Sequence, residues 1–278
     1  MIQTAISVES SADISAELAL KYDIKVIPYK ITLGEETFND GEKSPEEMFA
    51  FVDKTKTLPK TTALNEFEYA EFFESLKKDY DAVIHLCLSG GITSSCGNAF
   101  RAAAEMDNVF VVDSRSLSMG TGYLAIIART LADSGASPKE IVERLTDTVG
   151  KTITSFIVER LDYLHKGGRC SSIALLGANL LKIRPRIIMK DGKMVSDKKY
   201  RGTMPKVVSD FVGDLFSEFP PLGDTVCIAY TTATPEMLAA ATDKCTAAGI
   251  KNVITVRAGA TISSHCGANT LGVFYIVG

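Results

Sequence analysis

Two short stretches of the sequence gather small hydroxyl side chains just ahead of an expected helix. The first, "PKTTALNEFEY", places Thr61 and Thr62 before Asn65. The second, "CLSGGITSSCGNAF", brings Thr93 and Ser94 together with glycines between a strand and a helix. Backbone N–H groups at the start of a helix attract anions, and neutral hydroxyls add further donors. The two stretches together predict a site for a small anion such as a carboxylate, although each alone also resembles an ordinary helix cap.

The glycines of the second stretch do not form a nucleotide-binding motif. Gly90 and Gly91 fit neither the G-x-G-x-x-G pattern nor the G-x-x-x-x-G-K-[ST] pattern. The chain has 30 basic and 34 acidic side chains, a formal net charge of -4, and no long block of like charges. Nucleic acid is therefore not expected as a partner, because its phosphates require a basic surface.

The third chemically suggestive stretch is "TISSHCGANTLGVFYIVG", in which His265 and Cys266 are adjacent. A Cys–His hydrolase needs its thiol and imidazole to face each other. We expect a turn leading into the last strand here, and neighbouring residues of an extended segment point to opposite faces. There is also no G-x-S-x-G elbow to supply a serine nucleophile. No catalytic residue is expected, and a Ser/Cys–His acyl hydrolase or acyltransferase is kept as the alternative.

The histidines do not predict a metal site. His85, His165 and His265 are far apart in the sequence, and none has another ligand at the spacing of a zinc site. We interpret His85 as a core residue of a strand and place His165 in a surface turn. No metal and no cofactor are expected.

The segment "LDYLHKGGRCSSIALLGANLLKIRPRI" combines an arginine-containing turn with an apolar run. Residues 171–183 are apolar on nearly every side, which predicts a helix that is buried or that lines an apolar cavity. Arg169, Arg184 and Arg201 are expected either to lie on the solvated surface or to contact the anion.

Short β-branched runs alternate with capped helices along the chain, which is typical of an α/β fold. Helix starts are expected at Ser44-Pro45, Ser137-Pro138 and Thr234-Pro235, and Asp191-Gly192 predicts a type I′ hairpin. The expected strands are residues 3–8, 25–33, 81–88, 108–113, 154–159, 225–230, 252–258 and 272–277, besides those of the hairpin.

A chain of 278 residues is long enough to form two domains, each with its own core. We place the boundary near residue 150, with an N-terminal α/β domain at 1–150 that carries the hydroxyl-rich loops and a C-terminal α/β domain at 151–278 that carries the apolar helix. Six cysteines without a C-x-x-C pair, and no targeting or membrane-spanning run, indicate a protein of the reducing cytoplasm.

Several longer blocks of the sequence resemble one family from end to end. The chain is similar to the DegV family of bacterial fatty-acid-binding proteins. Some members of that family present a bound fatty acid to a separate kinase subunit. The blocks that carry the resemblance are "VESSADI", "PKTTA", "GITSSCGNA", "VVDSRSLSMGTGYL", "LDYLHKGGRCS", "KIRPRIIMKDGKM", "KKYRGTMPKV" and "SSHCGANTLG".

The resemblance implies an N-terminal domain with a doubly wound, mostly parallel sheet and a C-terminal α/β domain with a mixed sheet. It also implies a long-chain fatty acid whose carboxylate lies near the domain junction. Thr61 or Thr62 corresponds to the family's threonine-serine pair, Thr93 to the serine of its serine-glycine-threonine loop, and His265 to its late histidine.

From this resemblance we expect the carboxylate to be held by hydroxyls and a histidine. His265 would contribute either as an imidazolium or as a neutral donor. Arg169 and Arg201 correspond to arginines that face the kinase subunit in related proteins, and a transient contact with a membrane is left open. The expected carboxylate ligands are Thr61, Thr62, Thr93, Ser94 and His265.

The sequence departs from the family pattern at several positions near these residues. Glu9 replaces an aspartate, Ala63-Leu64 replaces glutamine-proline, and Ser94 replaces the central glycine of the loop. Cys266 stands where the family carries threonine. These departures concern the shape of the carboxylate site and hence the preferred acyl chain.

Overall fold

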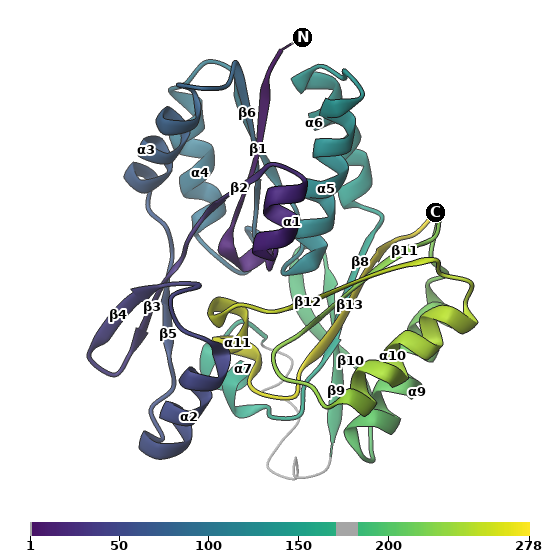
Figure 1. Cartoon of the computed structure of the whole chain (residues 1–278). Helices are drawn as coiled ribbons and strands as arrows, with labels where there is room; N and C mark the ends of the chain where they lie inside the picture. Colours follow the sequence, from purple (N-terminus) through teal and green to yellow (C-terminus); the bar gives the residue numbers. More distant parts are fainter. Residues whose placement is uncertain (1, 171–182) are drawn as a thin grey trace.

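The computed structural model describes residues 2–170 and 183–278. It contains three sheets (Figure 1). The first sheet is parallel throughout, in the order β2-β1-β6-β7. Its strands are β1 (Thr4–Glu9), β2 (Ile24–Ile27), β6 (Ala82–Cys87) and β7 (Val109–Asp113). Helices cover both of its faces, as a doubly wound sheet requires, with α3 and α4 on one side and α5 and α6 on the other (Figure 1).

Capping residues begin several of these helices as predicted. Ser44, Asn65 and Ser137 each form a capping box with the glutamate three residues on, and Thr234 accepts a hydrogen bond from the Met237 N–H. The helices of the first half are α1 (Ala16–Lys21), α2 (Pro45–Thr55), α3 (Glu66–Leu76), α4 (Ser95–Ala104), α5 (Met119–Asp133) and α6 (Pro138–Val149), with a 3-10 turn at Ser10–Ala12.

The expected strand at 25–33 is wrong as a single element. Pro28 has no N–H for a strand ladder and interrupts it, so that its first part joins the parallel sheet as β2 and its second part starts another sheet. That second sheet is small and antiparallel, with the order β4-β3-β5. Its strands are β3 (Lys30–Leu33), β4 (Glu36–Asn39) and β5 (Lys60–Thr62).

The third sheet is mixed, with β11 and β12 parallel and the other described pairs antiparallel. Its order is β10-β9-β8-β13-β11-β12. Its strands are β8 (Thr152–Ile157), β9 (Arg184–Lys190), β10 (Lys193–Tyr200), β11 (Thr225–Tyr230), β12 (Asn252–Arg257) and β13 (Leu271–Ile276). The helices of this half are α7 (Asp162–Gly167), α9 (Met204–Glu218), α10 (Pro235–Ala247) and α11 (Ala260–Cys266).

The hairpin between β9 and β10 has the predicted geometry. Asp191 and Gly192 both have positive φ, 49° and 74°, as a type I′ turn requires. The helix expected at 171–183 falls almost entirely on residues 171–182, which lie outside the described residues. The predicted domain boundary near Gly150 lies between the last strand of the parallel sheet and the first strand of the mixed sheet, and it stays a prediction.

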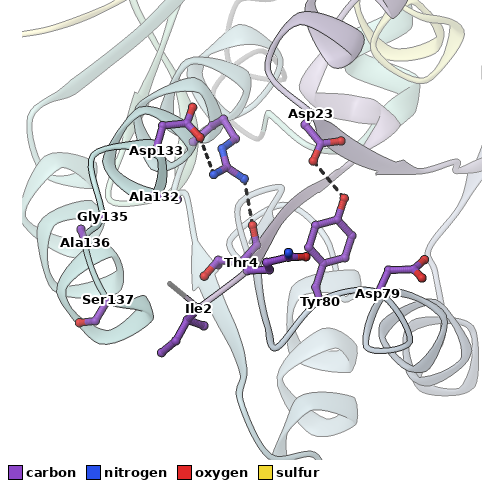
Figure 2. Close-up of a pocket in the computed structure, with 12 residues that line it drawn as sticks. Ile2, Thr4, Asp23, Asp79, Tyr80, Ala132, Asp133, Gly135, Ala136 and Ser137 are labelled. Atoms are coloured by element: carbon purple, nitrogen blue, oxygen red, sulfur yellow. Dashed lines mark hydrogen bonds and ion pairs between the residues drawn. The ribbon is translucent and has the colours of Figure 1, made fainter.

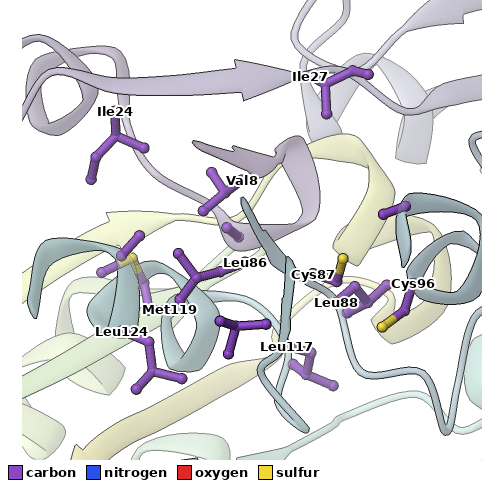
Figure 3. Close-up of a cluster of buried hydrophobic side chains, with 14 of the residues drawn as sticks. Val8, Ile24, Ile27, Leu86, Cys87, Leu88, Cys96, Leu117, Met119 and Leu124 are labelled. Carbon is purple, nitrogen blue, oxygen red and sulfur yellow. The ribbon is translucent and has the colours of Figure 1, made fainter. Parts of the chain in front are cut away.

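One hydrophobic core joins the two large sheets. Helix α5 lies between them and contacts β1 on one side and β11 and β13 on the other. Its buried residues Met119 and Leu124 lie in the same cluster as Val8 and Leu86 of the parallel sheet (Figure 3). Phe274 of the mixed sheet belongs to this cluster too. The shared core holds the two halves in a fixed arrangement, so that loops from both can build one site.

Candidate ligand-binding site

A cavity of about 80 Å³ lies between the two halves, beyond the carboxyl end of β6. Open α/β sheets bind ligands at this kind of edge. Four of the five predicted carboxylate ligands line the cavity, and Thr62 does not. The residues that line the cavity include Tyr29, Thr61, Thr93, Ser94, Leu117, Arg169, Met194, Thr261, Ile262, His265 and Cys266.

Strand β5 brings Thr61 to the cavity and turns Thr62 away. The Thr61 hydroxyl lies 2.9 Å from Nε2 of His265 and hydrogen bonds to it. Thr62 is exposed, because successive side chains of a strand point to opposite faces. Of the pair that the sequence could not separate, the structure therefore brings Thr61 to the cavity.

The loop after β6 holds Thr93 by a chain of hydrogen bonds. Thr93 Oγ1 lies 3.2 Å from Ser95 Oγ and accepts from the Ser95 N–H at 3.1 Å. Ser95 Oγ in turn accepts from the Leu64 N–H at 3.0 Å, which ties the two hydroxyl-rich stretches together. Ser94 is exposed at the rim. The loop therefore places Thr93 firmly against the segment that carries Thr61.

The tip of the β9–β10 hairpin packs against the same loop. The buried Ser89 hydroxyl donates to the Gly192 carbonyl at 2.7 Å. A Cβ on Gly91 would lie only 2.3 Å from that carbonyl oxygen, so this contact requires glycine at position 91. The hairpin also supplies Met194 to the cavity wall.

His265 lies on a short helix, α11, so the expected turn leading into the last strand is wrong. Two carboxylates from the first half of the chain hold the start of this helix. Asp40 accepts from the N–H groups of Ala260 and Thr261 at 2.8 and 3.3 Å, and Asp13 accepts from the Gly259 N–H at 2.8 Å. They satisfy N–H groups that a helix start otherwise leaves unpaired. Distant side chains therefore stabilise a helix that has no local capping signal.

The His265 ring is neutral near pH 7. Its burial, assisted by the charge of Arg169, lowers the pKa of the imidazole to about 4. Nδ1 has no partner among the described residues and faces Gly167, where a Cβ would lie 2.8 Å from it. Of the two forms expected from the sequence, the lowered pKa therefore favours the neutral ring, which can still donate or accept a hydrogen bond.

Cys266 is not an activated thiol. Burial, with the nearby charge of Asp13, raises the pKa of its thiol well above the usual range. A reactive cysteine needs a lowered pKa and some exposure. The structure gives no support to a Cys266–His265 nucleophilic pair.

The two arginines expected to face a partner lie in different places. Arg169 is exposed, donates to the Gly167 carbonyl at 2.6 Å and lines the rim of the cavity. Arg201 is exposed beyond β10 and does not line the cavity. Arg169 therefore lies both at the cavity and at the surface, whereas Arg201 lies at the surface alone.

Sequence reasoning missed two polar residues of the cavity, Tyr29 and Thr261. Tyr29 lies between β2 and β3, and Thr261 lies one helical turn before His265. The spacing of Thr261 and His265 would have indicated a shared face if the helix had been recognised.

A smaller apolar cavity of about 20 Å³ adjoins the first one, between α11 and the mixed sheet. Leu117, Ile262 and Cys266 line both cavities. The smaller cavity continues to Phe156 and Phe274 of the mixed sheet. The polar cavity therefore has an apolar continuation toward the core.

Comparison with known proteins identifies the family. The family model described as an uncharacterised protein of the DegV family matches residues 3–278. The chain belongs to the DegV family. Protein DegV of Bacillus subtilis is 30% identical over 275 residues, which are 97% of each chain. A DegV domain-containing protein of Caldanaerobacter subterraneus is 27% identical over 99% of each chain.

Solved DegV structures share the fold. The structure of DegV from Bacillus subtilis, described as a fatty acid binding protein, superposes with a TM-score of 0.86 at 26% identity and covers all of both chains. A Thermotoga maritima protein whose structure reveals a fatty acid binding function gives 0.83 at 26% identity, again over all of both chains. A DegV family protein from Thermus thermophilus, 23% identical, shares the fold with a TM-score of 0.90 over 99% of this chain and all of its own.

Glu9, at a departure from the DegV pattern, lies in a fully buried cluster beside the cavity loop. It accepts from the Tyr69 hydroxyl at 2.7 Å and from the Leu88 N–H at 2.8 Å. His85 lies 3.6 Å from it and pairs through Nδ1 with a serine of β1. Glu9, His85 and Cys87 have ligand atoms within 4.8 Å of one another, the kind of grouping that can hold a metal. Both Glu9 oxygens already accept hydrogen bonds. We therefore interpret the cluster as a structural group that fixes the start of the loop after β6.

A much larger groove of about 630 Å³ opens at the opposite edge of the parallel sheet of this DegV protein. Figure 2 shows hydrogen bonds and ion pairs between several of the residues that line it, Asp23 and Tyr80 among them. Arg129 binds Asp133 at 2.6 Å and donates to the Thr4 carbonyl at 3.0 Å, and the Tyr80 hydroxyl donates to Asp23 at 3.0 Å. Among the described residues that line the groove, only Nε of Arg129 is buried without a partner.

None of the helices in the described ranges 2–170 and 183–278 is long and apolar enough to cross a lipid bilayer.

Proposed function

We propose that this DegV protein binds a long-chain fatty acid with its carboxylate in the polar cavity and its tail in the apolar continuation. One observation carries the proposal: the cavity brings the Thr61–His265 pair opposite Thr93 and opens toward apolar side chains. That two DegV relatives at 26% identity are described as binding fatty acids supports it further.

The headgroup would be held by Thr61, Thr93, Ser94 and His265. A buried carboxylate is costly unless hydrogen bonds replace its water, and hydroxyl and imidazole donors provide them. Arg169 at the rim adds the positive charge that the neutral His265 lacks. Thr62, which faces solvent, is not part of this proposal.

The tail would extend past Leu117 and Ile262 toward Phe156 and Phe274. Each buried methylene contributes about 0.8 kcal/mol, so a chain of sixteen carbons offers roughly 12 kcal/mol before the cost of association. The two cavities are small, so side chains such as Ile262 must shift to admit a long tail. The tail thus supplies most of the affinity, and the polar cavity sets its direction.

We further propose that the protein presents the bound acid to a separate fatty acid kinase subunit in the cytoplasm and has no catalytic activity of its own. The exposed Arg169 and Arg201 would contact that subunit. Arg169 also lines the cavity, so it can face the kinase and the carboxylate at once. The alternative is a Ser/Cys–His acyl hydrolase or acyltransferase acting on its own. Its cysteine form is disfavoured at Cys266, because burial raises the pKa of that thiol.

The ligand class is tested by organic extraction of the purified protein and mass spectrometry. We expect long-chain fatty acids in the extract and a higher melting temperature after addition of palmitate or oleate. An extract without fatty acid, together with an unchanged melting temperature, would refute the proposal.

The division of roles is tested by two variants. Thr93→Val should weaken fatty acid binding, whereas Arg201→Ala should leave binding intact and slow phosphorylation by the kinase subunit. Equal losses of binding in both variants would contradict this division. Incubation of the protein alone with acyl esters should give no turnover if it is a carrier.

A further inference from the structure

Two hydroxyl groups in the polar cavity have no hydrogen-bond partner within 3.5 Å among the residues that the structure describes. They are the Tyr29 hydroxyl and Thr261 Oγ1. Both residues are almost fully buried, at 3% and 4% exposure. Buried polar groups in folded proteins nearly always have a partner, and leaving one unpaired is costly. Two such groups lining one cavity therefore point to a ligand that pairs with them.

The backbone on both sides holds Tyr29 in place. Its N–H donates to the Ser10 hydroxyl at 3.0 Å, and its carbonyl accepts from the Asp40 N–H at 2.8 Å. Burial, with the charge of Glu9, raises the pKa of the phenol well above its usual range and outweighs the hydroxyls of Ser95 and Thr93, which act in the opposite direction. Tyr29 therefore stays protonated and can donate a hydrogen bond at any physiological pH.

Thr261 is held with similar firmness. Its N–H donates to Asp40 at the start of α11. Because His265 follows four residues later, both side chains lie on the same face of the helix and both line the cavity. The Thr261 hydroxyl can donate and accept, so it can pair with an alcohol as well as with an anion.

A plain carboxylate does not need these two groups. Its two oxygens offer about four lone-pair positions. Thr93 donates to Ser95, and Thr61 and His265 share one hydrogen bond. The remaining donor of the Thr61–His265 pair, the Ser94 hydroxyl and the N–H groups of the Arg169 guanidinium at the rim can match those positions. The donors of the cavity thus exceed the acceptors of an unsubstituted fatty acid headgroup.

We infer that Tyr29 and Thr261 bind a second oxygen of the ligand, and that the cavity favours a fatty acid with a hydroxyl at carbon 2 or carbon 3 over the unsubstituted acid. The cavity of about 80 Å³ is small, so the second oxygen must lie close to the carboxylate. This inference rests on the proposed fatty acid binding and specifies its substrate class.

The test is a displacement titration of a fluorescent fatty acid with palmitate, 2-hydroxypalmitate and 3-hydroxypalmitate. We expect at least one hydroxy acid to bind about tenfold more tightly than palmitate, because a site built for a hydroxyl discriminates against the analogue that lacks it. In Tyr29→Phe and Thr261→Val the preference should fall to about threefold or less. Thr261→Ser, which keeps the hydroxyl, should retain it.

Two outcomes would overturn the inference. One is a wild-type protein that binds palmitate as tightly as both hydroxy acids. The other is a preference that survives in both Tyr29→Phe and Thr261→Val, with melting curves showing that the variants are folded. If none of the three acids displaces the probe, the proposed function itself fails, so the two failures are distinguishable.

Discussion

The groove and the cavity of this protein differ in volume and in how many of their buried polar atoms lack a partner. The larger of the two has fewer such atoms among the described residues. The groove at one edge of the parallel sheet is about 630 Å³, and the cavity at the other edge is about 80 Å³. In the groove Arg129 pairs with Asp133, and Tyr80 pairs with Asp23. In the cavity three lining residues keep buried polar atoms without a described partner. We propose the cavity as the site because of this unmet hydrogen-bonding capacity, and not because of its volume.

The groove and the cavity also differ in which parts of the chain line them. Residues from the first half of the chain line the groove, whereas both halves line the cavity. Helix α11 of the second half is held there by Asp13 and Asp40 of the first. A site at such a junction buries a ligand more completely than an open groove does.

The largest expected effect is a difference in how the free energy of unfolding depends on pH, between a residue of the cavity and a residue of the groove. The folded pKa of His265, about 4, lies below the ordinary value of 6.5, so the unfolded state binds more protons between these values. The free energy of unfolding should therefore fall as pH drops from 6.5 to about 4, by up to about 3 kcal/mol more in wild type than in His265→Gln. Denaturant titrations at several pH values measure this difference.

Asp23 in the groove provides the control for this pH effect. Burial raises its pKa, but hydrogen bonds from Lys25 and Tyr80 outweigh burial and lower it. Its stabilising contribution should be lost only as pH falls below the ordinary carboxyl range, so Asp23→Asn should follow wild type between pH 6.5 and about 4. Parallel curves for wild type and His265→Gln would show that His265 is not buried as described.

A smaller effect is expected from a matched pair of threonines. Thr61→Val removes a hydrogen bond to a charged headgroup and should weaken fatty acid binding by about tenfold to a hundredfold. Thr62→Val makes the same change one residue away on the exposed face and should leave the affinity unchanged, as should Asp133→Asn in the groove. Isothermal titration with oleate measures all three, and a loss in Thr62→Val equal to that in Thr61→Val would contradict the site.

The smallest effect is expected from a methyl group placed behind the imidazole. In Gly167→Ala the new Cβ would lie 2.8 Å from Nδ1 of His265 and push the ring. Binding should weaken by about fivefold, equivalent to ~1 kcal/mol of overpacking. Gly150→Ala is the control, since the nearest atom to its Cβ is 3.9 Å away. Unchanged affinity in Gly167→Ala would mean that the position of His265 does not matter for binding.

Features with local causes could be predicted from the sequence. The capping boxes at Asn65 and Ser137 and the Asp191-Gly192 turn each depend on residues within a few positions of one another. Thr93 could be predicted as a cavity residue for a similar reason, because it lies in a stretch rich in hydroxyl side chains before a helix. Thr61 could be predicted only as one of a pair with Thr62, since the same reasoning applies to both.

Features with distant causes could not be predicted. Helix α11 begins after Gly259, and its capping carboxylates come from Asp13 and Asp40, more than two hundred residues earlier. Without that helix, nothing in the sequence relates Thr261 to His265. The role of Tyr29 was hidden for a different reason, because Pro28 splits what looks like one continuous strand.

The most direct test of the central claim is photo-cross-linking with a fatty acid that carries a diazirine in the middle of its chain. Digestion and mass spectrometry then identify the labelled peptides. The account predicts labels beside the apolar continuation of the cavity, around Leu117, Ile262 and Phe274, and their loss in competition with oleate. Labels confined to the groove, around Tyr80 and residues 129–137, would contradict it.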